Sequence, residues 1–172
     1  GWDMADIEPE GLPAVKLEPL LALKNKQYLS DEDMVAYQKR NLIDIKSPNP
    51  SVETFLHAFL PFKYVDHTHA DAVLNVTNRP GGLNFCRKIF GDKTSIVPYV
   101  MPGFKLAKKI NEIYKKNPKI NCLVLMNHGI FTFADDCKEA YDLMIKYVSK
   151  AERAVKKLKS KKIKQIKKFS TK

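Results

Sequence analysis

The apolar residues recur at different periods along the chain, which predicts a fold with both helices and strands. Residues 104–116 carry apolar side chains every three or four positions, as one face of a helix does. The same period runs through residues 137–155, directly after an acidic pair at residues 135–136 that favours a helix start. Two shorter helices are expected after Ser30 and Ser51, because each hydroxyl can cap a first turn.

The helix after Ser51 is expected to begin at once, with Glu53 in its first turn. Pro61 is expected to end it, because proline cannot continue a helix. The apolar face of this helix would consist of Val52, Phe55, Leu56 and Phe59.

Short apolar runs elsewhere predict the strands of a sheet. Residues 122–126 and 130–133 are such runs, and residues 96–100 form another. Residues 63–77 allow two interpretations, because their valines favour extended structure whereas the segment around residue 71 can start a helix. Residues 78–82 contain one proline and two glycines and predict a loop. We therefore expect mixed α and β structure in one domain.

The composition is that of a soluble globular chain with a sizeable core. The chain has 172 residues, of which 44% are hydrophobic and 28% charged. Its longest uncharged apolar run is far shorter than the roughly 20 residues of a membrane span. The first residues lack the basic and apolar stretches of a secretory signal. Three scattered cysteines without a Cys-x-x-Cys pair predict reduced thiols and a cytoplasmic location.

The positive charge is concentrated at the end of the chain. The net charge is +11, and residues 156–172 hold nine lysines and no acid, which leaves +2 for residues 1–155. That body has no basic stripe interleaved with aromatic residues, so we expect no nucleic-acid partner. We predict a domain over residues 1–155 and a lysine-rich helix extension or linker over residues 156–172.

Three of the four histidines suggest a metal site. His67 and His69 form a His-x-His pair in a segment that can be extended, where residues two apart face the same side. His128 follows an apolar run and precedes Gly129, whose missing side chain allows a turn or a close approach. Either motif alone is commonly structural. Together, three imidazoles without a fourth dedicated ligand are typical of a catalytic zinc site with an open position.

A metal site of this kind needs an acid or base nearby, and Glu53 is the candidate. The alternative is that Glu53 is a solvated carboxylate at a helix start, which is the commoner situation. His57 lies one turn further along the same predicted helix, and we interpret it as structural.

Three segments together resemble the class II aldolase/adducin family. Residues 50–53 (Pro-Ser-Val-Glu) and 65–73 (Val-Asp-His-Thr-His-Ala-Asp-Ala-Val) resemble its core signature, and residues 127–133 (Asn-His-Gly-Ile-Phe-Thr-Phe) its second histidine motif. Residues 98–104 also fit. The chain looks most like the aldolase half of bifunctional proteins that join a rhamnulose-phosphate aldolase to a short-chain dehydrogenase.

This resemblance implies a three-layer αβα fold, with helices on both sides of a mainly antiparallel sheet, assembled as a homo-oligomer, usually a tetramer. It implies zinc, or another divalent metal, bound by His67, His69 and His128. Glu53 would be the catalytic proton shuttle, and Ser51 would bind substrate phosphate. Gly1 would be the last residue of a preceding phosphate-binding loop.

The implied reaction is aldol cleavage. The substrate would be a ketose phosphate such as a 6-deoxyhexulose 1-phosphate, and the products dihydroxyacetone phosphate and an aldehyde. The metal would stabilise the negative charge left when the carbon–carbon bond breaks. No membrane partner is expected for such an enzyme.

The chain also departs from the family pattern. A Gly-Asn-x-Ser loop before Glu53 and a Gly-x-Gly-x-x-Gly motif are both absent from the sequence, so we expect a chain truncated at both ends. Metal binding should survive truncation better than turnover. Two alternatives stay open: a sugar-phosphate epimerase or dehydratase that uses the same metal site, and an adducin-like, non-catalytic interaction module. In the second, the lysine-rich tail with Phe169 and Ser170 would bind acidic membranes.

Overall fold

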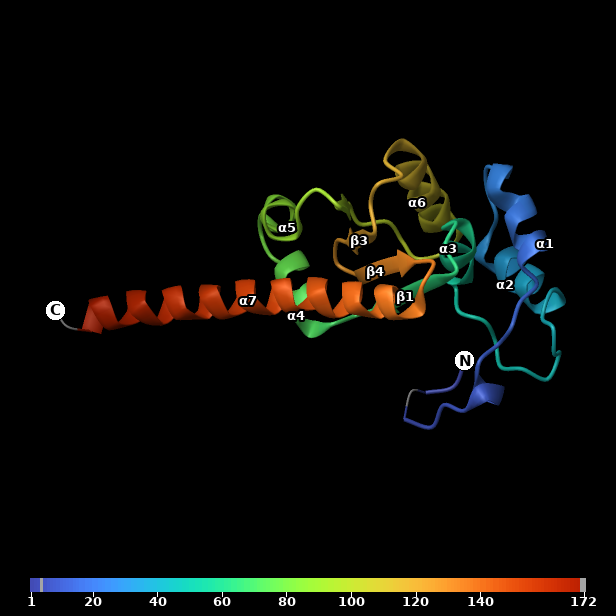
Figure 1. Ribbon diagram of the computed structural model, residues 1–172, viewed down its shortest axis with the longest axis horizontal. Helices are drawn as coiled ribbons and strands as arrows, with labels where there is room; N and C mark the ends of the chain where they lie inside the picture. The colour runs from blue at the N-terminus through green and yellow to red at the C-terminus, as the bar shows by residue number, and fades with distance from the viewer. Residues whose placement is uncertain (4, 171–172) are drawn as a thin grey trace. The chain divides into compact units, whose positions relative to one another are not determined.

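The computed structural model describes the backbone of residues 1–3 and 5–170, and the side chains as far as Leu158. It contains two compact units. The first joins residues 1–61 to residues 100–117, and the second joins residues 62–99 to the chain from Pro118 onward. Figure 1 shows the elements of both. Together they form a mixed α/β fold with a four-stranded sheet flanked by helices, as expected.

Helices build the first unit. Phe104 begins the longest of them, where the apolar period predicted it, and meets Phe55 and Phe59 edge to face at centroid distances of 5.4 and 6.0 Å. These buried rings join the two stretches of chain that form the unit. Its elements are η1 (Pro9–Gly11), α1 (Leu17–Ala22), η2 (Leu23–Asn25), α2 (Asp31–Arg40), α3 (Thr54–Phe59) and α6 (Phe104–Lys116).

The helix predicted after Ser30 is confirmed, whereas the start predicted for the next helix is wrong. Ser30 Oγ accepts a hydrogen bond from the backbone N–H of Asp33 and caps α2. Helix α3 begins only at Thr54, so Val52 lies outside the helix and is 43% exposed. Ser51 Oγ instead accepts from the backbone N–H of Glu53, a local side-chain turn that competes with a helical start.

The second unit is built on one sheet with the strand order β1-β4-β3-β2. The pairs β1–β4 and β3–β4 are antiparallel, and β2–β3 is parallel, so the sheet is mainly antiparallel. Every residue of β3 and β4 is buried, which is why both read as continuous apolar runs. The strands are β1 (Tyr64–Thr68), β2 (Thr94–Val97), β3 (Cys122–Leu125) and β4 (Gly129–Ala134).

Three helices of this unit pack with the sheet around a common core: α4 (Asp71–Thr77), α5 (Gly82–Phe90) and α7 (Cys137–Ser170). Asp136 Oδ1 accepts from the backbone N–H of Glu139 and caps α7, as the acidic pair predicted. Helix α7 contacts β4, β1, α4 and α5 (Figure 1). Its buried face includes Ala140, Met144, Tyr147 and Ala151.

Each of the two interpretations of residues 63–77 holds for part of the segment. Residues 64–68 form strand β1, and residues 71–77 form helix α4, in which Val73 and Val76 are core residues.

Two other local predictions in this unit need correction. The loop predicted over residues 78–82 is shorter than expected, because α5 begins at Gly82. The N-cap residue Gly81 has a φ of 71°, a left-handed backbone that glycine adopts without strain. Strand β2 also lies two residues earlier than predicted, at Thr94–Val97.

Helix α7 runs past residue 155 without a break in its backbone. The domain division at that residue stays a prediction, and the side chains of Phe169 and Ser170 lie outside the described residues. Over the described part of the chain, none of the helices combines the length and apolar character that crossing a bilayer requires.

The three cysteines should differ sharply in reactivity. Burial raises the pKa of Cys86 to about 11 and that of Cys122 to about 12, whereas Cys137 is exposed at the start of α7. Since the thiolate is the reactive form, a raised pKa and a closed core both slow reaction. We predict that at pH 8 a disulfide reagent modifies one thiol rapidly in the native chain and all three in guanidinium. Rapid reaction of a native Cys137→Ser variant would contradict this.

Candidate metal centre

His67 is held in place by its neighbours on the sheet. It lies on β1 opposite Phe131 of β4, and the two rings stack at a centroid distance of 3.9 Å. His67 Nδ1 lies 2.9 Å from the backbone carbonyl oxygen of Ile130, to which it can only donate. This hydrogen bond places a proton on Nδ1 and leaves Nε2 of the neutral ring as a ligand atom.

His69 follows the end of β1, so the argument that both rings share one face of a strand holds only in part. The chain turns after Thr68 and enters α4 at Asp71, with His69 in the connection. The two Nε2 atoms of His67 and His69 are nevertheless 2.9 Å apart. Both can reach one ion at that separation, because a zinc–nitrogen bond is about 2.1 Å long.

His128 comes from the tight connection between β3 and β4, which is formed by three residues between Leu125 and Gly129. Asn127, in the middle of this connection, has a φ of 60°. This is the left-handed conformation, which asparagine tolerates better than most residue types other than glycine. His128 itself is 9% exposed, whereas His69 is exposed. The histidines of the cluster therefore differ in solvent exposure, from the buried His128 to the exposed His69.

Gly129 provides the space in which the rings of His67 and His69 lie. A Cβ atom at this position would be 2.6 Å from the carbonyl oxygen of Thr68, 2.8 Å from Cδ2 of His69 and 3.0 Å from Cε1 of His67. Its backbone is not in the left-handed region, so the turn itself relies on Asn127. The sequence suggested a glycine needed for a turn or a close approach, and the close approach is what the structure shows.

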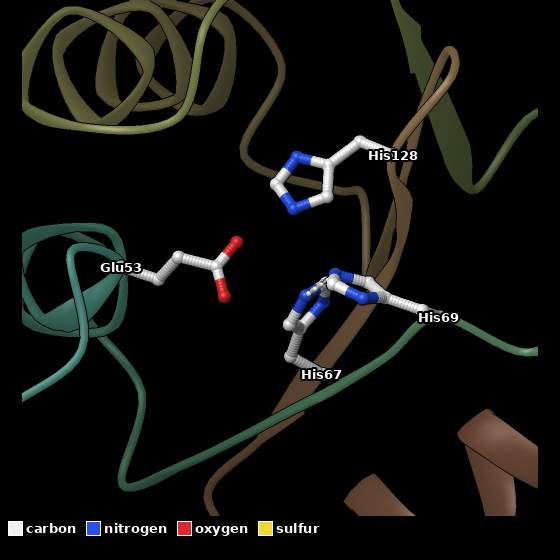
Figure 2. Close-up of side chains that lie close together, drawn as sticks. All are labelled: Glu53, His67, His69 and His128. Atoms are coloured by element: carbon white, nitrogen blue, oxygen red, sulfur yellow. Dashed lines mark hydrogen bonds between the residues drawn. The ribbon is translucent and has the colours of Figure 1, made fainter.

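The three imidazoles form one cluster (Figure 2). Ring centroids are 4.7 Å apart for His67 and His69, 5.3 Å for His67 and His128, and 5.0 Å for His69 and His128. One nitrogen of each ring lies within 4.8 Å of the others. Three imidazoles, one of them oriented by the hydrogen bond of His67 Nδ1, suit a divalent transition metal, so these residues fit such an ion.

The other predicted site residues lie in the first unit. Glu53 is the half-buried N-cap residue of α3, and its carbonyl oxygen accepts from the backbone N–H groups of Leu56 and His57. Ser51 precedes it, with its hydroxyl bonded as described above. The terminal ammonium of Gly1 donates to the carbonyl oxygen of Asn49 at 2.8 Å, which ties the start of the chain to this segment.

The role of Phe131 and of the Ile130 carbonyl was not predicted from the sequence. Both lie in an apolar run that indicates only a buried strand. Their contact with His67 depends on the register of β1 against β4, and a single sequence does not show that register.

Comparison with known proteins identifies the family. The model of the class II aldolase and adducin N-terminal domain matches residues 22–155. The chain belongs to the class II aldolase/adducin family. Members of this superfamily are generally lyases.

Solved structures support the same assignment. The N-terminal class II aldolase domain of a conserved protein from Thermoplasma acidophilum is 42% identical, with a TM-score of 0.81 over 90% of this chain and 71% of that one. YgbL from Klebsiella pneumoniae is 18% identical, with a TM-score of 0.58 over 86% of this chain and 65% of that one. The second likeness shows the fold alone.

A curated relative is much longer than this chain. The uncharacterized oxidoreductase YuxG of Bacillus subtilis (strain 168) is 36% identical over 155 residues, which are 90% of this chain and 22% of that protein. This chain therefore spans about a fifth of the length of that relative.

Replacing Gly129 with alanine should damage the centre. We expect Gly129→Ala to destabilise the fold by about 1–3 kcal/mol, because the new Cβ must displace the end of β1. It should also weaken zinc binding, because the rings of His67 and His69 must move. Thermal unfolding and a zinc titration measure the two effects.

Gly81→Ala is the matched control. It strains a left-handed residue at a position with no atom within 4 Å of the new Cβ. It should therefore lower stability and leave zinc affinity unchanged. Equal zinc affinity in Gly129→Ala and the parent chain would refute the spatial role of Gly129.

Proposed function

We propose that this chain is the aldol-cleaving domain of a zinc-dependent lyase acting on a ketose phosphate. A 6-deoxyhexulose 1-phosphate is the substrate type we expect, with dihydroxyacetone phosphate and an aldehyde as products. The convergence of three imidazole nitrogens from β1, the β1–α4 connection and the β3–β4 connection is the observation that supports this. The proposal includes a cytoplasmic location and a homotetrameric assembly.

His67, His69 and His128 would hold the zinc ion. A bound divalent ion supplies Lewis acidity toward the carbonyl and hydroxyl oxygens of the substrate. The chain's part is to orient the three imidazoles, and for His67 the hydrogen bond from Nδ1–H to the Ile130 carbonyl does so. Exposure of His69 leaves one side of the cluster open to solvent, where a substrate could enter.

Glu53 would carry the proton in the reaction. In aldol cleavage the hydroxyl of the future aldehyde loses its proton to water, and the electron pair of the broken carbon–carbon bond stays on the carbon beside the carbonyl. That carbon then takes up a proton, which we assign to the Glu53 carboxyl group. Its half-buried position at the start of α3 suits this role, because a general acid or base works best where it is partly shielded from bulk water.

Ser51 and Gly1 would contact the substrate phosphate. Ser51 accepts the Glu53 N–H through its oxygen, so its hydroxyl hydrogen can still be donated to an anion. The ammonium of Gly1 lies against Asn49, two positions before Ser51 along the chain.

An epimerase or a dehydratase could use the same imidazoles. A screen of ketose 1-phosphates against pentulose 5-phosphates separates these activities, and aldehyde formation from the former supports a lyase. An adducin-like interaction module would have neither turnover nor a need for metal.

The first test concerns the metal. The purified chain should hold zinc in stoichiometric amount, and His67→Ala should lower the affinity by at least about 100-fold, since even outer-shell partners are worth 10–100-fold. Elemental analysis and competition with a chelating dye measure this. His57→Gln changes the one histidine outside the cluster and should keep the metal. Equal metal content in all three proteins would end the proposal.

The second test concerns Glu53. Glu53→Gln should keep its zinc but exchange the proton of dihydroxyacetone phosphate with deuterium oxide about 100- to 10,000-fold more slowly, because the general base is lost. Proton NMR follows the exchange. Glu112→Gln, an exposed change on α6, is the control and should exchange at the parent rate. An unchanged rate in Glu53→Gln would remove Glu53 from the mechanism.

A further inference from the structure

Helices α5 and α7 border a cleft of 640 Å³ that shares no residue with the imidazole cluster. This volume lies within the range of sites that bind small molecules. The lining combines apolar and positively charged side chains, and none of the nine described residues that form it is acidic. The cleft lies wholly within the second unit.

The floor of the cleft is apolar. Phe85 and Ile89 of α5 and Ala154 of α7 are half-buried and pack with their inner sides against the core of the unit. Leu158 extends this surface by one further turn of α7. The guanidinium of Arg79 lies 4.6 Å from the centre of the Phe85 ring, which adds a positive charge beside the floor.

Two of the cations at the cleft have a structural function. Lys150 Nζ donates to the carbonyl oxygen of Phe90 at 2.9 Å, and so satisfies the end of α5. Lys88 lies in the last turn of α5, where a positive charge suits the helix dipole. Arg153 and Lys157 are exposed on α7, far from either end of that helix, so this explanation does not apply to them.

Gathered cations repel one another, and an anion in the cleft would offset this repulsion. An apolar floor with a cationic rim is complementary to a molecule that has an apolar body and an anionic group. Arginine and lysine form strong charge-assisted hydrogen bonds with phosphate, so phosphate is the natural head group. A bilayer surface fits less well, because the apolar residues are recessed between the helices and only half-exposed.

We propose that the cleft between α5 and α7 binds a free amphipathic anion, namely a phosphate monoester of an alkyl or aryl group. The phosphate contacts the cations of α7 and of the last turn of α5, and the apolar body lies on Phe85, Ile89 and Leu158.

Calorimetric titration with octyl phosphate, below its micelle concentration, tests the proposal. Octyl phosphate should bind at least tenfold more tightly than inorganic phosphate, which lacks the apolar body, and than octyl glucoside, which lacks the charge. The zinc-loaded chain and His67→Ala are titrated in parallel, because phosphate could also bind at the imidazoles. If octyl phosphate binds in the cleft, both proteins should bind it with equal affinity.

Neighbouring residues of α5 offer matched variants. Lys88→Ala should weaken octyl phosphate binding by about tenfold, the effect of one charged hydrogen bond. Arg87→Ala should have little effect, because Arg87 bonds to Asn84 and does not line the cleft. Leu158→Ser should weaken octyl phosphate binding and leave inorganic phosphate unaffected. Circular dichroism checks that each variant is folded.

Several results would overturn the proposal. If octyl phosphate does not bind, or binds no better than inorganic phosphate, an amphipathic ligand is excluded. Equal losses in Lys88→Ala and Arg87→Ala indicate diffuse attraction without a site. Loss of octyl phosphate binding in His67→Ala shows that the ligand binds at the imidazoles and not in the cleft. Binding to phosphatidylglycerol vesicles without binding to free octyl phosphate indicates a membrane surface.

Discussion

The close packing of Gly129 against the end of β1 is the constraint on which the candidate metal centre depends. The absence of a side chain lets the first residue of β4 approach Thr68, and only then can the rings of His67 and His69 lie beside His128. The register of β1 on β4 adds the hydrogen bond to Ile130 and the stacking on Phe131. The ligand geometry is thus a property of backbone pairing, and the histidines only occupy the positions that pairing provides.

Much of this arrangement could be predicted from the sequence, for identifiable reasons. Helix α6 and the first turns of α7 were predicted because an amphipathic face of a dozen residues repeats its period several times. Strands β3 and β4 were predicted because they are buried along their whole length. The histidines were chosen because few other residue types bind zinc, and the motifs around His67 and His128 reinforced each other.

The parts that were missed depend on contacts between segments distant in sequence. Helix α5 is short, and glycines occupy its N-cap and its first position, so its local signal favours a loop until its apolar face meets the core through Cys86 and Phe90. Glu53 was expected in a first turn, but the hydroxyl of Ser51 bonds to its backbone and delays α3. The cleft between α5 and α7 has no signal in the sequence, because its cations and its apolar floor come from helices about 60 residues apart.

The division of the chain into two units bears on how function could be lost. The three imidazoles of the candidate metal centre belong to the second unit, whereas the proposed proton shuttle and phosphate contacts belong to the first. Under the proposed function, a change that loosens the first unit would therefore abolish turnover and leave the three imidazoles in place. A change at Gly129 or in the register of β1 would instead displace the rings of His67 and His69, and would do so whether or not a substrate is bound. Metal content and proton exchange thus report on separate parts of the chain, and a class II aldolase fold with bound metal is not by itself evidence of catalysis.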